Sequence, residues 1–96
     1  MIKHIVFFKM NEEGKADNIV KLKTALEGLV GKIPSLLKLE VGVDFNGSAA
    51  ASDVSLFTVF ELKSDLEKYQ VHPEHLKVVE LVKTVTSERH VVDYEV

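Results

Sequence analysis

The sequence predicts an α+β domain in which strands and helices follow the order β-α-β-β-α-β. Stretches rich in β-branched and aromatic residues lie at 2–10, 36–45, 54–62 and 90–96, and helix-like stretches separate the first pair and the last pair. No linker or low-complexity tract interrupts the chain. We therefore expect one domain over residues 1–96, built on a four-stranded antiparallel sheet.

The first strand and the first helix have the clearest patterns. Residues 2–10 contain no Gly or Pro and alternate between two faces. The segment Asn11–Gly14 then supplies a capping candidate and acidic residues suited to a helix N-terminus. A helix over about 15–31 is predicted by apolar residues at steps of three and four, with Gly31 and Pro34 as its stop signals. These apolar residues are Ile19, Leu22, Leu26, Leu29 and Ile33.

The middle of the chain predicts two strands joined by a loop. Residues 36–45 form the second strand and residues 54–62 form the third. Between them, residues 46–53 read as a loop, because Gly47 and Ser52 bracket too short a run of alanines for a helix.

The last third predicts a helical crossover and a final strand. Ser64-x-x-Glu67 opens a short helical turn in the style of a capping box. Pro73 suits the first position of a further helix that runs to about Thr84. The last strand covers 90–96.

Composition and charge exclude several functions. The chain is 46% apolar and 28% charged, with a formal net charge of −3 and no cysteine, so we expect a folded protein without disulfides or a thiol nucleophile. There is no basic stripe for nucleic acid, and no run of about 18 apolar residues for a membrane. The N-terminus enters a strand pattern without the apolar core of a signal peptide. We therefore expect a soluble cytoplasmic protein.

The strands carry apolar residues on both faces, although two helical segments can cover only one face of such a sheet. A bare second face would be an apolar patch larger than monomers usually expose. We therefore expect a homodimer through sheet-to-sheet packing, and the alternative is a monomer with scattered surface hydrophobic residues. The residues of this second face are Ile5, Phe7, Phe57, Val59, Val92 and Tyr94.

Five stretches of the chain also match a known family in type and in order. They are residues 2–9, Ile33-Pro34, residues 53–60, Leu66-x-x-Tyr69-x-x-His72-Pro73-x-His75, and Val92-Asp93-Tyr94. Together they resemble the stress-responsive A/B barrel domain (Dabb) family of dimeric α+β barrels. The resemblance spans nearly the whole chain. It implies a ferredoxin-like topology, a tight homodimer whose two sheets form a barrel, and a connection with stress response.

The candidate site centres on Tyr69, His75, His4 and Asp93. Imidazole has an unperturbed pKa near neutral pH, so it suits proton transfer. If Pro73 opens a helix, His75 lies in its first turn, where the helix dipole disfavours a positive charge and lowers the pKa. In the topology that the resemblance implies, the first and last strands are neighbours. His4 and Asp93 then point into one cavity between sheet and helices.

The resemblance also implies a chemistry. The family includes stress-induced plant proteins and a polyketide cyclase that closes a ring by an aldol-type reaction without metal or cofactor. In cyclase-type members, the histidine that matches His75 acts as base and the tyrosine that matches Tyr69 supports the developing enolate. This chain departs from them at Val54, where they have a histidine. We expect a cofactor-independent cyclase or lyase for a small apolar carbonyl compound, with His4 and Asp93 in substrate binding.

Structural roles for the same residues stay open. Tyr69 can bury its ring and bond a backbone carbonyl, and His75 with Asp93 can form a polar pair that joins helix to sheet. His72 is best interpreted as orienting the turn before Pro73. These readings give a non-catalytic dimer that binds a small ligand or protects under stress. A cofactor-free monooxygenase is the weakest alternative.

The remaining charged and imidazole side chains receive no role in chemistry. His72 and His75 are three residues apart, but no third histidine is near in sequence, so we expect no metal site. His90 is interpreted as a surface residue or a contact at the dimer rim. Solvated helix or strand faces account for Lys68, Lys77, Lys83 and Glu88.

Overall fold

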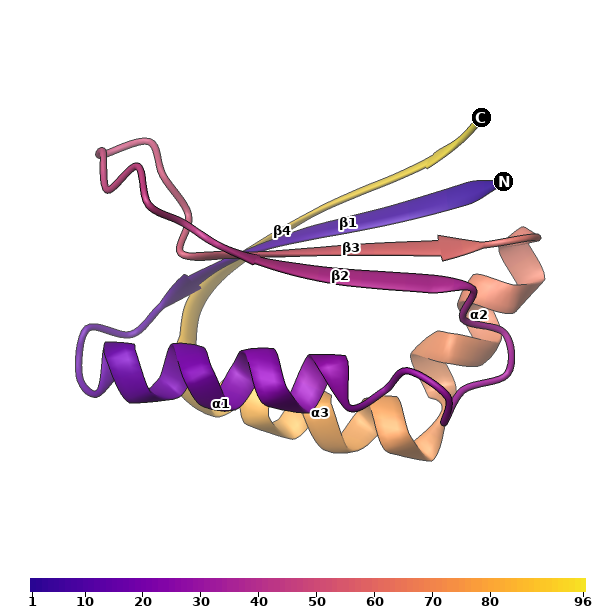
Figure 1. The fold of residues 1–96 in the computed structure, drawn as a ribbon, viewed down its shortest axis with the longest axis horizontal. Coiled ribbons are helices and arrows are strands. Elements are labelled where there is room, and N and C mark those ends of the chain that lie inside the picture. Colours follow the sequence, from indigo (N-terminus) through magenta and orange to yellow (C-terminus); the bar gives the residue numbers. More distant parts are fainter.

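Helices cover one face of a four-stranded sheet in the computed structural model, which describes all 96 residues (Figure 1). The sheet has the order β2-β3-β1-β4, and every neighbouring pair of strands is antiparallel. This arrangement confirms the predicted α+β ferredoxin-like fold. The elements are β1 (Ile2–Met10), α1 (Lys15–Glu27), β2 (Lys38–Val43), β3 (Val54–Phe60), α2 (Lys63–Val71), α3 (Pro73–Val85) and β4 (Thr86–Glu95).

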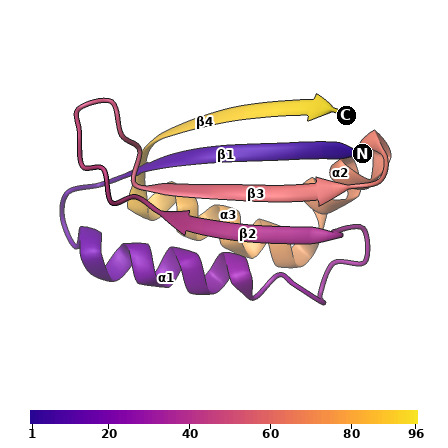
Figure 2. The ribbon, with the colours of Figure 1, turned by 45° about the horizontal axis from the view of Figure 1, so that its top comes forward.

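β1 lies inside the sheet, between β3 and β4, whereas β2 and β4 form its edges (Figure 2). Its even-numbered residues all face the helices and are buried, because successive side chains in a strand point to opposite faces. His4 is therefore held in the same row as four apolar side chains. The members of this row are Ile2, His4, Val6, Phe8 and Met10.

The main core lies between the helices and this face of the sheet. Each helix contributes buried apolar side chains to it, and the inward faces of β1, β2 and β3 complete it. β4 contributes almost nothing, since its residues beyond Thr86 are exposed. The largest fully buried side chains are Tyr69, Phe60, Met10, Leu22, Leu26 and Leu29.

α1 is shorter than its sequence predicts at the C-terminal end. It ends at Glu27 and not at residue 31, although Leu29 and Ile33 beyond it are buried as expected. Glycine costs about 1 kcal/mol in a helix interior, and Gly28 and Gly31 follow closely, the latter with φ 83°. At the other end, Gly14 with φ 69° is the N-cap, and no side chain caps the helix.

The second crossover consists of two helices and not one helical turn plus a helix. The predicted capping box at Ser64 and Glu67 is wrong: the carboxylate of Asp65 accepts a hydrogen bond from the Leu62 backbone N–H at 3.2 Å. Leu62 is therefore the N-cap, and α2 begins at Lys63, one residue before Ser64. α3 begins at Pro73 as predicted, because its ring fixes φ near the helical value and its missing N–H has no helical partner to lose.

β4 starts at Thr86, four residues before the predicted boundary at 90, and pairs there with Met10. The residues 86–90 are polar and lie on an exposed edge strand, so they lack the apolar alternation that marks a half-buried strand. β2 and β3 are in turn slightly shorter than predicted.

Candidate functional site

A cavity of about 410 Å³ lies between α3 and the sheet. Its wall is mainly aliphatic, and two imidazoles, those of His4 and His75, lie in it together. The cavity that was expected to hold His4 and Asp93 thus holds His4 and His75, and Asp93 does not line it. The lining residues are His4, Val6 and Phe8 of β1, Leu26, Leu56, Gln70, Arg89, and six residues of α3 from His75 to Lys83.

His75 is the third residue of α3, since Pro73 occupies the first helical position. Its Nδ1 lies 3.1 Å from the backbone carbonyl oxygen of Gln70. A carbonyl oxygen only accepts, so Nδ1 carries the proton and donates it, and in the neutral ring Nε2 keeps the lone pair. This bond fixes one tautomer and leaves Nε2 as a base.

The pKa of His75 is lowered from its ordinary value of 6.5. Burial is the main cause, because it disfavours the charged form, and the charges of His4, Arg89 and His72 act in the same direction. The hydrogen bond to Gln70 opposes them. The predicted direction is thus confirmed, with burial as its leading cause. The lowered pKa favours the neutral imidazole, which is the form able to accept a proton.

His4 is almost fully buried and pairs with Asp93 across the β1–β4 register. Its Nδ1 is hydrogen-bonded to Oδ1 of Asp93, whose side chain is 41% exposed. The sequence pointed to Asp93 either beside His4 or paired with His75. The structure brings Asp93 to His4, and the His75–Asp93 pair is wrong because His75 bonds to Gln70 instead. Asp93 itself lines a separate hollow near Leu66 and Lys63.

Tyr69 packs near both imidazoles. Its ring centroid lies 4.3 Å from that of His75 and 6.2 Å from that of His4. The side chain is fully buried and does not line the cavity. Its hydroxyl has no hydrogen-bond partner, so the predicted bond to a backbone carbonyl is wrong. Burial raises the pKa of Tyr69 above its ordinary value of 10.0, which keeps the phenol protonated and able to donate.

His72 has a structural position. It is the N-cap of α3, and its Nδ1 accepts a hydrogen bond of 3.1 Å from the Glu74 backbone N–H. This satisfies one of the free donors at the start of the helix and confirms the interpretation of His72 as a turn residue. His90 is exposed and pairs with Phe7 in the β1–β4 register, on the face away from the helices. No group of three or more His, Asp or Glu side chains is arranged to hold a metal ion.

The sequence analysis missed the two charged lining residues, Lys83 and Arg89, and also Gln70, whose carbonyl holds His75. Lys83 was assigned to a solvated face, and Arg89 received no role. The periodicity of each element could have indicated both positions. Lys83 lies eight residues after His75, which returns it to a similar face of the helix. Arg89 lies on the same strand face as Asp93. Both cations lie at the margin of the cavity.

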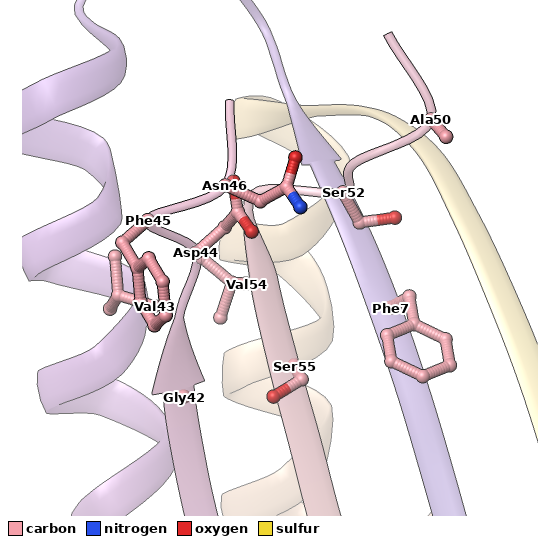
Figure 3. Close-up of a pocket in the computed structure, with 10 residues that line it drawn as sticks. All are labelled: Phe7, Gly42, Val43, Asp44, Phe45, Asn46, Ala50, Ser52, Val54 and Ser55. Atoms are coloured by element: carbon pink, nitrogen blue, oxygen red, sulfur yellow. The ribbon is translucent and has the colours of Figure 1, made fainter. Parts of the chain in front are cut away.

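A larger hollow of about 550 Å³ lies elsewhere, where the loop between β2 and β3 meets the face of the sheet that the helices do not cover (Figure 3). Phe7 and Ser55 form its floor, and loop residues such as Asn46 and Ser52 form its side. It contains no imidazole, and Asp44 is its only ionisable group. This hollow therefore belongs to the sheet surface and not to the candidate site.

The face of the sheet away from the helices, here called the open face, carries apolar side chains without cover. Phe7, Val92 and Tyr94 are 40%, 53% and 41% exposed, respectively. Ile5 and Phe57 are half-buried on the same face. Of the six residues predicted to be exposed there, only Val59 is buried, where it pairs with Lys38 and accepts a hydrogen bond from the Leu37 N–H.

No helix combines the length and apolar character needed to cross a membrane.

Solved structures with this fold include dimeric proteins. A dimeric protein of unknown function with a ferredoxin-like fold from Bacteroides fragilis is 32% identical, with a TM-score of 0.90, and 99% of this chain and 95% of that one are covered. A dimeric ferredoxin-like protein of unknown function from Thermobifida fusca is 25% identical, with a TM-score of 0.89 and coverage of 99% and 90%.

A hydroxynitrile lyase from Passiflora edulis is 16% identical, with a TM-score of 0.85 and coverage of 97% and 90%. At this identity the likeness shows the shared fold alone. Among functionally curated proteins, no sequence matches this chain. The pattern of the Stress responsive A/B Barrel Domain (Dabb) matches residues 2–96, and the chain belongs to that family.

Proposed function

We propose that this protein is a cofactor-independent enzyme of the lyase or cyclase type that acts on a small carbonyl compound. The observation that supports this most directly is the hydrogen bond from His75 Nδ1 to the Gln70 carbonyl, beside a largely apolar cavity of about 410 Å³. That bond orients a neutral imidazole whose Nε2 is a base, and a cavity lined mainly by apolar residues suits a small carbonyl compound.

In this reaction, Nε2 of His75 takes a proton from the carbon next to a carbonyl group. The electron pair of the broken C–H bond moves onto the carbonyl oxygen and forms an enolate. The enolate carbon then attacks a second carbonyl in the same molecule, and the new alkoxide recovers the proton from the His75 imidazolium. Protons and electrons balance without an outside oxidant or reductant.

Tyr69 and His4 have supporting roles in this proposal. The Tyr69 phenol is protonated and has no protein partner, so it can donate a hydrogen bond to the enolate oxygen. This role requires its hydroxyl to reach the cavity when substrate is bound. His4, held through Nδ1 by Asp93, orients the substrate with its other nitrogen.

The lyase from Passiflora edulis is consistent with the proposed class, because it shows that a protein with this fold can carry a lyase site. The test is a screen of β-polyketones and β-keto acids with the parent protein and a His75→Ala, Tyr69→Phe double variant. We expect turnover by the parent, and a loss of roughly 10²-fold or more in the variant. Equal rates for the two proteins would overturn the proposal.

The protein is further proposed to act as a homodimer in which the open faces of two sheets pack together. The exposed side chains of Phe7, Val92 and Tyr94 need such a cover, and an isologous contact supplies the same patch from both copies. The related proteins from Bacteroides fragilis and Thermobifida fusca are dimeric. A monomer mass in sedimentation at micromolar concentration would contradict this assembly.

A second candidate function is a non-catalytic dimer that binds a small apolar ligand or protects under stress. The observation that favours it is that each cavity imidazole is already hydrogen-bonded within the protein, His75 to Gln70 and His4 to Asp93. Such bonds can serve only to satisfy buried polar groups and to join neighbouring elements, here α3 to α2 and β1 to β4. In that case His75→Ala lowers the melting temperature and removes no turnover.

A further inference from the structure

The cavity beside His75 has two chemically different ends. Phe8 lies four residues beyond His4 on β1, a distance of roughly 13 Å along a strand, and Arg89 pairs with Phe8. On α3, Lys83 lies eight residues beyond His75, a rise of about 12 Å. By backbone position, the imidazoles therefore lie toward one end of the cavity and the two cations toward the other, and the charge of Arg89 still acts on His75, whose pKa it lowers.

The cationic end has no matching acid. No Asp or Glu is among the residues that line the cavity. Arg89, the only arginine of the chain, makes no ion pair. Lys83 has one partner, Glu80, at 3.6 Å, and both side chains are well exposed, so that pair contributes little. Arg89 therefore leaves a positive charge without an ion pair at this end, in a chain with a net charge of −3.

The wall between the two ends is aliphatic. Val6 and Leu56 line it from the sheet, and Val79 and Val82 line it from α3. A ligand that fills the cavity thus meets imidazoles, then an apolar stretch, then cations. This order of surfaces defines the kind of molecule that fits.

We propose that the ligand is an amphipathic carbonyl compound whose far end carries an anionic group, held by Arg89 with help from Lys83. This inference rests on the proposed function, because it places the carbonyl at His75. The guanidinium stays charged at all relevant pH values and offers paired N–H donors to a carboxylate or a phosphate. The anion is a carboxylate or a phosphate group at the far end of the apolar chain.

The test uses three probes with the same chain: octanoate, octyl phosphate and neutral octanol. Each is titrated by NMR into the parent protein and into Arg89→Gln, Lys83→Gln and Lys77→Gln. Lys77 is a matched control, since it pairs with Glu74 at 3.3 Å on the same helix but does not line the cavity. Thermal unfolding of each variant checks that it is folded.

We expect the parent to bind at least one anionic probe more tightly than octanol. Arg89→Gln should weaken that binding by about tenfold, the loss of a charge-assisted hydrogen bond, and should change octanol binding little. Lys77→Gln should bind the anionic probes as tightly as the parent does. Tighter binding of octanoate identifies a free acid as the ligand class, and tighter binding of octyl phosphate identifies a phosphorylated one.

Equal binding of the anionic probes by the parent and Arg89→Gln would overturn the anionic subsite, as would anionic probes that bind no better than octanol. The two proposals fail separately. Arg89-dependent binding without turnover in the β-keto screen overturns the catalytic function and leaves the anionic ligand. Turnover in that screen with Arg89-independent binding overturns the anionic subsite alone.

Discussion

The ring of Tyr69 lies against the ring of His75, with 4.3 Å between their centroids and 46° between their planes. The phenol is a hydrogen-bond donor without a protein partner, and the imidazole keeps one nitrogen free after its bond to Gln70. The two rings thus lie in contact, with the imidazole in the cavity wall and the phenol buried behind it. The proposed enolate chemistry needs this pair of groups.

Tyr69→Phe separates catalysis from stability. The variant keeps the buried ring and removes a hydroxyl that has no partner, so the free energy of unfolding should stay the same or rise by up to about 1 kcal/mol. If the hydroxyl supports the enolate, kcat should fall by roughly 10²-fold. Urea unfolding and steady-state kinetics measure the two effects. A clear loss of stability would instead give the hydroxyl a structural role.

His75 should make the protein less stable in acid. Its pKa is lowered by burial in the folded protein, whereas the unfolded chain has the ordinary value of 6.5, so the unfolded state binds the proton more readily. The stabilisation linked to neutral His75 is complete above pH 6.5, and it declines as the pH falls toward the lowered pKa.

The measurement for this effect is the free energy of unfolding at about pH 8 and about pH 5 for the parent and for His75→Gln. The difference between the two pH values should be smaller in the variant. Should both proteins show the same acid sensitivity, His75 would not be the buried titrating group described here.

His72 should matter for stability and not for turnover. Its Nδ1 caps α3 through the Glu74 N–H, and loss of an N-cap costs about 1 kcal/mol. His72→Ala should therefore lower the free energy of unfolding by that amount. His72→Asn restores a capping acceptor and should recover most of it. A large loss of activity in the folded His72→Asn variant would indicate that His72 takes part in the reaction.

Val92→Lys should disrupt the proposed dimer. Val92 is 53% exposed on the open face, next to Ile5 in the register, so a lysine there would place two ammonium groups in one apolar interface. Sedimentation should show a shift from dimer to monomer. Val71→Lys is the control, because Val71 is 70% exposed on α2, away from the open face. A Val92→Lys protein that remains dimeric would point to a different interface.

The sequence by itself determined the order of elements, the buried face of β1 and the position of His75 at the start of α3. These features depend on local physics, namely the two-residue period of a strand, the helix period and the preference of proline for a first helical turn. Boundaries were less accurate where local signals conflict, as at Gly28 in α1 and along the polar start of β4.

The tertiary structure alone decided which side chains meet. His4 and Asp93 are 89 residues apart, and only the β1–β4 register makes Asp93 the partner of His4 and leaves Gln70 to His75. The same packing buries Tyr69 behind the cavity wall and places Arg89 at its far end. Such contacts depend on strand register and on how a helix lies across a sheet, and a one-residue shift in register would reverse every face.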